Sequence, residues 1–498
     1  MQSYILGVDI GTGSTKAVAV DFNGEAFDVT QHYYPVKSPK PGYSEQDPAL
    51  ILDAFINCIN DMVKKTGKAP HAISLSSAMH SVIPVDSNGK ALADMITWAD
   101  ARSEDIAEKL RNSDQGPEIY KTSGTPIHAM TPLCKLIWLR ENETTLFNNA
   151  DKFIGIKEYI WYNLFGVFEI DYANAAATGL FDIINLKWNP EACSLAGITT
   201  EKLSVPVNTT YKRSGLSNTV SEKLNLPSET IFVIGASDGC CANLGSFVNT
   251  PDTASLTIGT SGAVRITSPQ PVYDFGAMIF NYLLNEKTFV CGGAINNGGI
   301  VLNWLIKSFL DKKQAGPADY EAVFEKINSV TAGSEGLIFL PYLYGERAPL
   351  WDTKSCGVYF NIKQQHTQAH FLRAGLEGIC FALNNVLQTL EQSSSPIRQL
   401  NISGGFITST VWTQILADIT GKELAIVQQE DASAIGAVFL AMDALNLPSP
   451  KQSVVNGQTE NIIPNSGNHQ IYNQNFQVFK KLYTDLKETM HWVHKMPF

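Results

Sequence analysis

The sequence has no long apolar run and few charges. Only 17% of its 498 residues are charged, whereas 44% are hydrophobic, a balance typical of a folded chain long enough for two or more cores. No apolar stretch approaches the ~20 residues that span a bilayer. The first apolar run follows Met-Gln-Ser directly, without the basic segment or cleavage site of a signal peptide. We therefore expect a cytoplasmic protein with no membrane partner.

Paired cysteines and basic character are absent as well. The eight cysteines contain no C-x-x-C pair, which predicts buried thiols in a reducing compartment rather than disulfides or a zinc site. The formal net charge is −11 and the pI is about 5.4. Because nucleic-acid-binding surfaces are basic, we expect no nucleic-acid partner.

The glycine-rich stretch "YILGVDIGTGSTKAVAVDFNGEAF" (residues 4–27) lacks the common nucleotide-binding motifs. The P-loop spacing G-x-x-x-x-G-K-[ST] is missing, and Lys16 stands where a dinucleotide fingerprint needs its third glycine. Asn23-Gly24 is a strong hairpin signal. The pattern predicts three successive strands, at 4–10, 17–22 and 25–34. The glycine loop therefore joins two strands rather than a strand and a helix.

The residues of this loop suit an anion and a metal ion. Glycines let backbone N–H groups approach an anion closely, and hydroxyl side chains add donors. The predicted phosphate-binding residues are Gly11, Thr12, Gly13, Ser14, Thr15 and Lys16. Asp9, at the tip of the first strand, is placed to hold hydrated Mg²⁺ against a phosphate. The alternative is an ordinary tight turn that Asp9 caps.

The same strand–loop design recurs later in the chain. Residues 254–267 repeat it around Gly259 and Thr260, and 400–421 give a strand, the Gly404-Gly405 turn and a helix. Ligands of open α/β sheets lie beyond the carboxyl ends of the strands, where these loops fall. Turn formers at 246–253 mark the predicted boundary between two related α/β domains. We expect domains at 1–248 and 249–445, and an extension at 446–498 packed on the second domain, with a mobile loop before a helix at about 474–492.

Asp238 follows an apolar strand within "VIGASDGCCANLGS" (233–246). One interpretation is an N-cap for a helix at 239–245. The other is a general base for a hydroxyl group, the role that an aspartate has in protein kinases. The two interpretations are compatible, because a cap position is also an exposed strand end.

Polar residues after two neighbouring strands predict a pocket for a polyol. "SSAMHS" (76–81) and "TWADARS" (97–103) supply paired donors and acceptors of the kind that hydroxyl groups need. The predicted sugar-binding residues are Met79, His80, Trp98, Asp100, Arg102, His128 and Asp238. Arg102 or Lys135 is suited to mark an anionic substrate. The alternative for Arg102 is a salt bridge to Asp100 or Glu104 that only braces the loop.

Together these motifs resemble the FGGY carbohydrate kinases, within the larger actin-like and hexokinase-like ATPase group. The resemblance covers residues 4 to about 440. Its segments are "MTPLCKLIWLREN" (130–142), "DYANAAATGLFDI" (171–183), "GASDGCCANLG" (235–245), "GTSG" (259–262) and "GERAPLWD" (345–352). In "GVYFNIKQQHTQAHFLRAGLEG" (357–378), Asn361 and Gly375 depart from the family's second signature, which puts the local loop and helix packing in doubt.

The resemblance implies a ribonuclease-H-like fold duplicated in two lobes, with ATP and Mg²⁺ in the cleft between them. It implies a metal-organising role for Asp9, with Asp238 close to the metal and acting as the catalytic base. Thr12 and Ser14 would belong to the first phosphate loop and Thr260 to the second. Gly404 and Gly405 would form the adenosine loop.

Within that family the chain looks most like the gluconate kinases. We expect transfer of the ATP γ-phosphoryl group to a primary hydroxyl of D-gluconate, giving 6-phosphogluconate. The nearest alternative is the same chemistry on xylulose or another polyol. Alternatives of another class are an actin-like ATPase switch and a sugar-sensing regulator that has lost the chemistry. The expected partners are a small sugar acid or polyol and ATP, with a homodimer as a candidate assembly.

Overall fold

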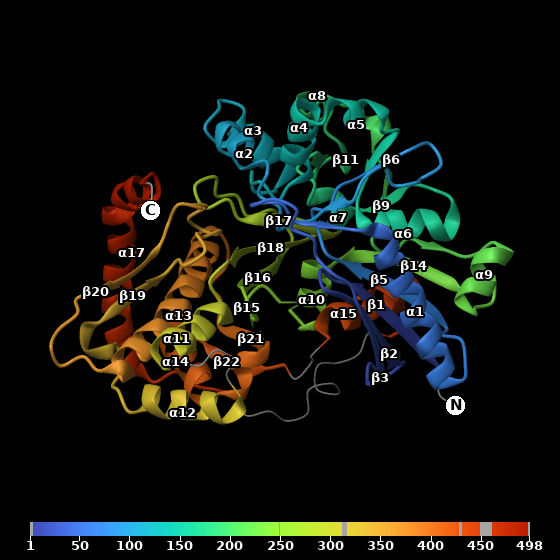
Figure 1. Cartoon of the computed structure of the whole chain (residues 1–498). Helices are drawn as coiled ribbons and strands as arrows, with labels where there is room; N and C mark the ends of the chain where they lie inside the picture. Colours follow the sequence, from blue (N-terminus) through green and yellow to red (C-terminus); the bar gives the residue numbers. More distant parts are fainter. Residues whose placement is uncertain (1–2, 249, 311–315, 428–430, 449–460, 497–498) are drawn as a thin grey trace.

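The computed structural model describes all residues except 1–2, 249, 311–315, 428–430, 449–460 and 497–498. The chain forms two lobes, each built on a six-stranded sheet, and helices lie between and outside the sheets (Figure 1). A group of short helices and two-stranded sheets extends the first lobe over the top of Figure 1.

The first sheet begins as the glycine and hairpin signals predict. Its strands are β1 (Tyr4–Ile10), β2 (Ser14–Asp21), β3 (Ala26–Tyr33), β5 (Ala72–Ser77), β13 (Lys212–Arg213) and β14 (Ile231–Ser237), in the order β13-β14-β5-β1-β2-β3. Strands β1, β2 and β3 are antiparallel neighbours, whereas β5 and β14 run parallel to β1. Asp21 accepts hydrogen bonds from the backbone of Asn23 and Glu25, and Gly24 has a φ of 90°, as a tight hairpin requires.

The second sheet repeats this arrangement. Its strands are β15 (Thr253–Ile258), β16 (Gly262–Ser268), β17 (Phe280–Asn285), β18 (Thr288–Ile295), β21 (Gln399–Ser403) and β22 (Glu423–Ile426), in the order β17-β18-β16-β15-β21-β22. Strands β18, β16, β15, β21 and β22 have the order and directions of β3, β2, β1, β5 and β14. The duplicated α/β fold predicted from the recurring loops is confirmed.

The helices are α1 (Pro48–Thr66), α2 (Glu104–Arg111), α3 (Gly116–Ser123), α4 (Pro132–Asn142), α5 (Thr144–Asn149), α6 (Ile156–Phe165), α7 (Tyr172–Ala176), α8 (Pro190–Ala196), α9 (Asn218–Leu224), α10 (Asp238–Gly245), α11 (Gly299–Leu310), α12 (Pro317–Asn328), α13 (Gln368–Ser393), α14 (Thr410–Thr420), α15 (Ala432–Ala444) and α17 (Ser466–His494). Short 3-10 turns are Thr200–Lys202, Ser334–Gly336 and Gly405–Thr408. The remaining strands are β4 (Glu45–Gln46), β6 (Ile83–Val85), β7 (Met95–Ile96), β8 (Lys152–Ile154), β9 (Glu169–Asp171), β10 (Phe181–Asp182), β11 (Lys187–Trp188), β12 (Val205–Val207), β19 (Ile338–Pro341) and β20 (Gly357–Phe360).

Helices α10 and α15 lie between the two sheets (Figure 1). Helix α15 follows the second sheet in sequence, yet it packs on the first sheet, where Val438 and Met442 join a core with Ile5 and Val233. The packing is close: a Cβ added at Gly7 of β1 would lie 2.1 Å from the carbonyl oxygen of Ala434. The two lobes therefore share a core layer.

The C-terminal helix differs from its prediction. Helix α17 spans Ser466–His494, so it begins eight residues before the predicted start at 474. Asn465 caps it by accepting a hydrogen bond from the Asn468 backbone. This N-cap was missed because Asn465 falls within the segment that was predicted to be a loop. Residues 449–460 of the predicted mobile loop lie outside the described residues. Tyr472 and Phe476 of α17 pack on Phe381 of α13.

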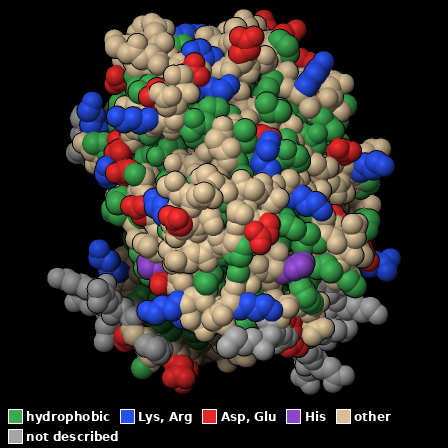
Figure 2. All heavy atoms as spheres, turned by 90° about the vertical axis from the view of Figure 1, so that its right-hand side faces the viewer, with side chains coloured by type: hydrophobic (Ala, Val, Ile, Leu, Met, Phe, Trp, Pro, Cys, Tyr) green, Lys and Arg blue, Asp and Glu red, His purple; other side chains and the backbone are tan. Residues whose placement is uncertain are grey.

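Charged side chains of both signs are interspersed over the face of the molecule that Figure 2 shows. The described parts of the chain contain no helix whose length and hydropathy would allow it to cross a membrane.

Candidate active site

Asp9 and Asp238 lie at the same edge of the first sheet. Strands β1, β5 and β14 are parallel neighbours, and their register sets Asp9 beside Ser76 and Ser237 beside Ser77. The carboxyl ends of these strands therefore meet, as ligand sites of α/β sheets require. The Ser76 hydroxyl donates a 2.7 Å hydrogen bond to Asp9 Oδ1.

Both carboxyl groups are less acidic than usual. Burial raises the pKa of Asp9, although the bond from Ser76 acts against this shift. Burial, followed by the charge of Asp9, raises the pKa of Asp238 to about 6. Such a carboxylate accepts a proton near neutral pH more readily than an ordinary aspartate does. The pair has the properties expected of a base beside a cation site.

The N-cap interpretation of Asp238 is wrong. Ser237 caps α10, because its hydroxyl accepts from the backbone of Cys240 over 3.3 Å. Asp238 is the first helical residue, and its side chain accepts from the Gly239 backbone over 2.7 Å. The hydroxyl one residue earlier caps the helix, so the Asp238 carboxylate is not needed as the cap.

The first glycine loop is held by its neighbours. Gly11 donates to the Ser14 carbonyl over 3.0 Å, and the Tyr34 hydroxyl donates to the Gly11 carbonyl over 2.6 Å. Gly13 faces open space, so an anion has access to the loop. Thr15 is buried against Tyr34, and Lys16 forms a 2.5 Å ion pair with Asp431 at the start of α15. Ser14 accepts from Gln31.

A cavity of about 690 Å³ lies beside the second glycine loop. Gly259, Thr260, Gly405 and Phe406 line it together with residues of α11, α12 and α14. Gly404 supports this wall: its φ is 106°, and a Cβ there would lie 2.3 Å from the Ile258 carbonyl oxygen. Only glycine fits that position. The cavity is large enough for a nucleoside.

Among the described residues, no three His, Cys, Asp or Glu side chains are grouped closely enough to hold a metal ion. Mg²⁺ needs no such cage when it binds with substrate phosphates through one or two carboxylates. The donor set of Asp9 and Asp238 fits a hydrated Mg²⁺ of that kind.

Lys135 joins the two polar clusters of the predicted sugar pocket. Its buried ammonium donates to the carbonyl oxygens of His80 and Thr97 over 2.6 and 2.7 Å, so it holds both loops and does not face a substrate. Burial lowers the Lys135 pKa to about 7.

His80 has a defined tautomer. Nδ1 lies 2.7 Å from the carbonyl oxygen of Ala177 and must donate to it, so Nε2 accepts from the Tyr282 hydroxyl 3.3 Å away. Burial, then the charge of Lys135, lowers the His80 pKa to about 3, and the ring is neutral. Its φ of 66° is in the left-handed region, which non-glycine residues rarely occupy outside constrained sites.

Arg102 is fully engaged by two carboxylates. Its Nε and Nη2 donate to the two oxygens of Asp100 over 2.8 Å each, and Nη2 also reaches Glu45 over 2.5 Å. The guanidinium stacks 3.9 Å above the Tyr43 ring. The geometry favours the bracing alternative for Arg102 and Asp100, with Glu45 in place of Glu104.

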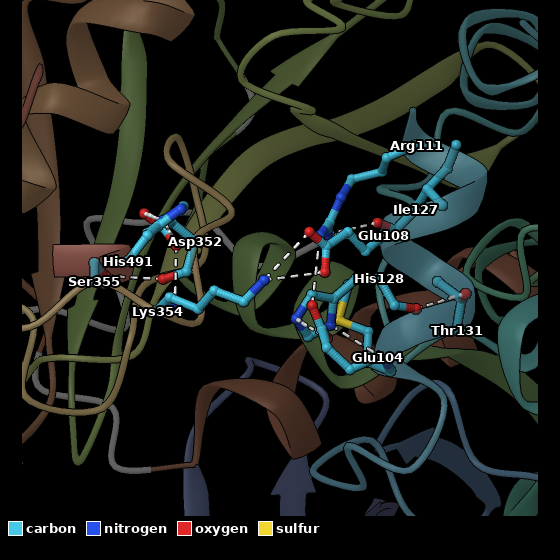
Figure 3. A network of polar contacts seen from close by, with 11 residues as sticks. Glu104, Glu108, Arg111, Ile127, His128, Thr131, Asp352, Lys354, Ser355 and His491 are labelled. Atoms are coloured by element: carbon cyan, nitrogen blue, oxygen red, sulfur yellow. Dashed lines mark hydrogen bonds and ion pairs between the residues drawn. The ribbon is translucent and has the colours of Figure 1, made fainter. Parts of the chain in front are cut away.

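His128 belongs to a network that reaches from the first lobe to the C-terminal helix (Figure 3). Burial, then the charge of Arg347, lowers its pKa to about 3, and its ring lies 5.3 Å from the Trp351 ring. Lys354 points across to α2 and contacts Glu108 at 3.2 Å. Behind it, Asp352 pairs with His491 of α17 at 2.8 Å. The network bridges the two lobes.

Several residues at this cleft come from the second half and were not predicted. They are Arg265, Tyr282, Arg347, Trp351 and Asp431. Arg347 lies 5.5 Å from the Trp98 ring. A signal for Arg265 was present, since it is a charged residue inside the apolar strand "SGAVRIT". Arg347 and Trp351 belong to the motif "GERAPLWD", to which no role had been given.

Known proteins resemble this chain in sequence and fold. The N-terminal domain of the FGGY family of carbohydrate kinases matches residues 4–245, and the C-terminal domain of that family matches 254–445. A gluconokinase of Bacillus subtilis is 41% identical over 89% of this chain and 88% of its own length.

Two solved structures from Lactobacillus acidophilus, a gluconate kinase and a ligand-bound xylulose kinase, each superpose with a TM-score of 0.93 at 34% identity. They cover 98% and 97% of this chain, respectively, and 98% of each of those chains is covered. The chain therefore belongs to the FGGY family of carbohydrate kinases, phosphotransferases that use an alcohol group as acceptor.

Proposed function

We propose that the protein transfers the γ-phosphoryl group of ATP to a primary hydroxyl of D-gluconate, giving 6-phosphogluconate. The observation that carries the proposal is the position of Asp238, which directly follows β14 where the carboxyl ends of β14, β5 and β1 meet beside Asp9. The raised pKa of its carboxyl group, about 6, is consistent with this role. The gluconokinase relative at 41% identity supports the choice of acceptor.

In this proposal Asp238 takes the proton of the acceptor hydroxyl as that oxygen attacks phosphorus. Asp9, with Asp238 nearby, would hold the hydrated metal. Bound Mg²⁺ would neutralise charge that develops on the phosphate oxygens. The chain's own donors then position the phosphates: the backbone of residues 11–14 with the hydroxyl groups of Thr12 and Ser14 on one side, and Gly259 and Thr260 on the other. Lys16 acts through its ion pair with Asp431.

The nucleoside is assigned to the cavity between α11, α12 and α14, with Gly404 and Gly405 at its edge. The acceptor is assigned to the space between the lobes, against Met79, His80, Trp98 and His128. His80 offers no charge at neutral pH, so it contacts hydroxyl groups rather than a carboxylate. Asp100 and Arg102 brace that wall.

We also propose that the chain is divided into domains at 1–248 and 249–445, with the extension at 446–498 packed on the second domain.

Xylulose is the second candidate acceptor. It is favoured by the xylulose kinase structure, which is 34% identical to this chain, as is the gluconate kinase structure. Purified protein with ATP, Mg²⁺ and either gluconate, xylulose or glycerol distinguishes the candidates through ADP release. We expect kcat/KM for gluconate to exceed the others by at least about tenfold, because an ionic contact contributes more than 1.4 kcal/mol. Equal turnover of gluconate and a neutral acceptor would overturn the gluconate assignment. A rate of ATP hydrolysis that does not change when any of these acceptors is added would favour an ATPase switch.

A further inference from the structure

Arg265 reaches from the second sheet to the helix that carries Asp238. It lies on β16 opposite Gly292, and its side chain ends at the first turn of α10. A Cβ added at Gly239 would lie 3.5 Å from Arg265 Nε and 3.3 Å from Met79 Cε. The guanidinium, the Met79 side chain and the residue after Asp238 therefore meet at one point of the cleft.

The guanidinium of Arg265 has no hydrogen bond or ion pair within the described parts of the chain. Burial lowers its pKa, while the charge of Asp238 acts in the opposite direction. An arginine keeps its proton in proteins, so a cation whose N–H groups have no acceptor among the described residues borders the cleft. Arg102 differs, because two carboxylates surround it. Arg347 differs too, because its Nε and Nη2 donate to Asn296 and the Ile295 carbonyl.

A partly buried guanidinium without a partner is stabilised by an oxyanion that accepts two parallel hydrogen bonds. Two oxyanions enter this cleft, a sugar carboxylate and the transferred phosphoryl group. The surroundings of Arg265 favour the carboxylate. Its Nε and the Met79 Cε both lie close to Gly239. The Tyr282 hydroxyl acts on the charge of Arg265 and bonds to His80. Met79 is assigned to the acceptor side of the cleft, and Tyr282 bonds to His80 of that same side.

We propose that Arg265 binds the carboxylate of the sugar acid and makes the pocket specific for an acid over a neutral polyol. The inference rests on the proposed function, which names an acid as acceptor. It places acid recognition on the second lobe, opposite the base on the first. The acid then bridges the two sheets, and a neutral polyol of the same length leaves the Arg265 charge unpaired.

Two variants and a matched control test the assignment. Arg265→Met removes the charge and retains an unbranched stem, whereas Arg265→Lys retains the charge without the planar fork. Arg398→Met, an exposed arginine of the same lobe, is the control. The substrates are gluconate and sorbitol, the neutral hexitol with a hydroxymethyl group in place of the carboxylate.

In Arg265→Met we expect kcat/KM for gluconate to fall on the order of 10²-fold, the usual effect of losing a charge-assisted pair. Sorbitol turnover and the KM for ATP should change less than about threefold. Arg265→Lys should lie between wild type and Arg265→Met. Calorimetry with nucleotide-free protein should show the same loss in gluconate affinity, and retained sorbitol turnover shows that the variant is folded.

Equal losses with both acceptors and in acceptor-free ATP hydrolysis would overturn the proposal and assign Arg265 to the phosphoryl group. Unchanged gluconate kinetics in Arg265→Met would overturn it as well. The wild-type protein tests the proposed function separately: failure to phosphorylate gluconate refutes the gluconate kinase, whereas the ratio of variant to wild type reports on Arg265 alone.

Discussion

The indole Nε1 of Trp98 donates a 2.8 Å hydrogen bond to the hydroxyl oxygen of Thr12. Trp98 lies in the polar cluster after β7, and Thr12 lies in the first glycine loop. Gln46 of β4, which pairs with Met95 of β7, also donates to the Thr12 carbonyl over 2.7 Å. Two hydrogen bonds therefore tie the segment around β4 and β7 to the first glycine loop, and we expect a ligand bound at one to affect binding at the other.

Replacing Trp98 by Phe should weaken this link. The loss of one neutral hydrogen bond costs about 1 kcal/mol. We therefore expect kcat/KM for ATP at saturating gluconate to fall roughly fivefold. The KM for ATP should also respond less to added sugar. Trp492→Phe, at a position 64% exposed on α17, is the matched control. Steady-state kinetics across a grid of both substrates measure the effect, and unaltered coupling in Trp98→Phe would contradict it.

Asp238→Asn should preserve the fold and nucleotide binding while turnover falls by a factor on the order of 10²–10⁴, the usual contribution of a positioned base. In wild type, kcat/KM should rise with pH through about 6 and then level off, because only the ionised carboxylate accepts a proton. This rise of kcat/KM with pH should be absent from the residual activity of Asp238→Asn. Full activity in Asp238→Asn would remove Asp238 from the mechanism.

The same carboxyl group should make the protein less stable at neutral pH. Its pKa in the folded state is near 6, above that of the unfolded chain, so ionisation favours unfolding. The destabilisation grows as pH rises from about 4 to 6 and is complete above that range. Asp238→Asn should therefore raise the free energy of unfolding at pH 7.5 by on the order of 2 kcal/mol, and by nothing near pH 3.5. Denaturant titrations at both pH values measure this. A gain that does not depend on pH would refute it.

Asp9→Asn should raise the Mg²⁺ concentration needed for half-maximal activity, because a neutral amide is a poorer ligand for a hard cation. We expect a shift on the order of tenfold, with turnover recovering partly at high Mg²⁺ or Mn²⁺. Chelator should abolish wild-type activity. The exposed Asp53→Asn is the control. If the Mg²⁺ titrations of Asp9→Asn and wild type coincide, the loop is only a turn.

The bridge between Lys354 and Glu108 should contribute to closure of the lobes. Both side chains are partly exposed, so the ion pair contributes less than about 1 kcal/mol and weakens with salt. Scattering profiles of wild type should show compaction when nucleotide and sugar are both added. Lys354→Met should need more ligand for the same compaction at low salt. Adding Glu108→Gln to Lys354→Met should not raise the required ligand concentration further. Identical profiles with and without ligands would count against a closing cleft.

Local signals predicted much of this architecture. Asn23-Gly24 specified the first hairpin, and the Gly404-Gly405 turn correctly separated a strand from a helix. Contacts between distant segments were beyond such patterns. Arg265 and Tyr282 reach the acceptor wall only because the second sheet faces the first. Likewise, Arg102 is engaged by Glu45, which β4 brings beside β7. The cap of α10 was misassigned because Ser237 and Asp238 are equally good N-caps by residue type.

Helix α15 also governs the order in which the molecule is able to assemble. During synthesis, β1, β5 and β14 emerge long before α15 does. Until then the apolar face formed by Ile5, Val18 and Val233 has no cover, and such surfaces aggregate. The close backbone contacts at Gly7 and Gly436 leave no room for another, less closely packed segment in place of α15. We therefore expect the first lobe to complete its core only when nearly the whole chain has been made.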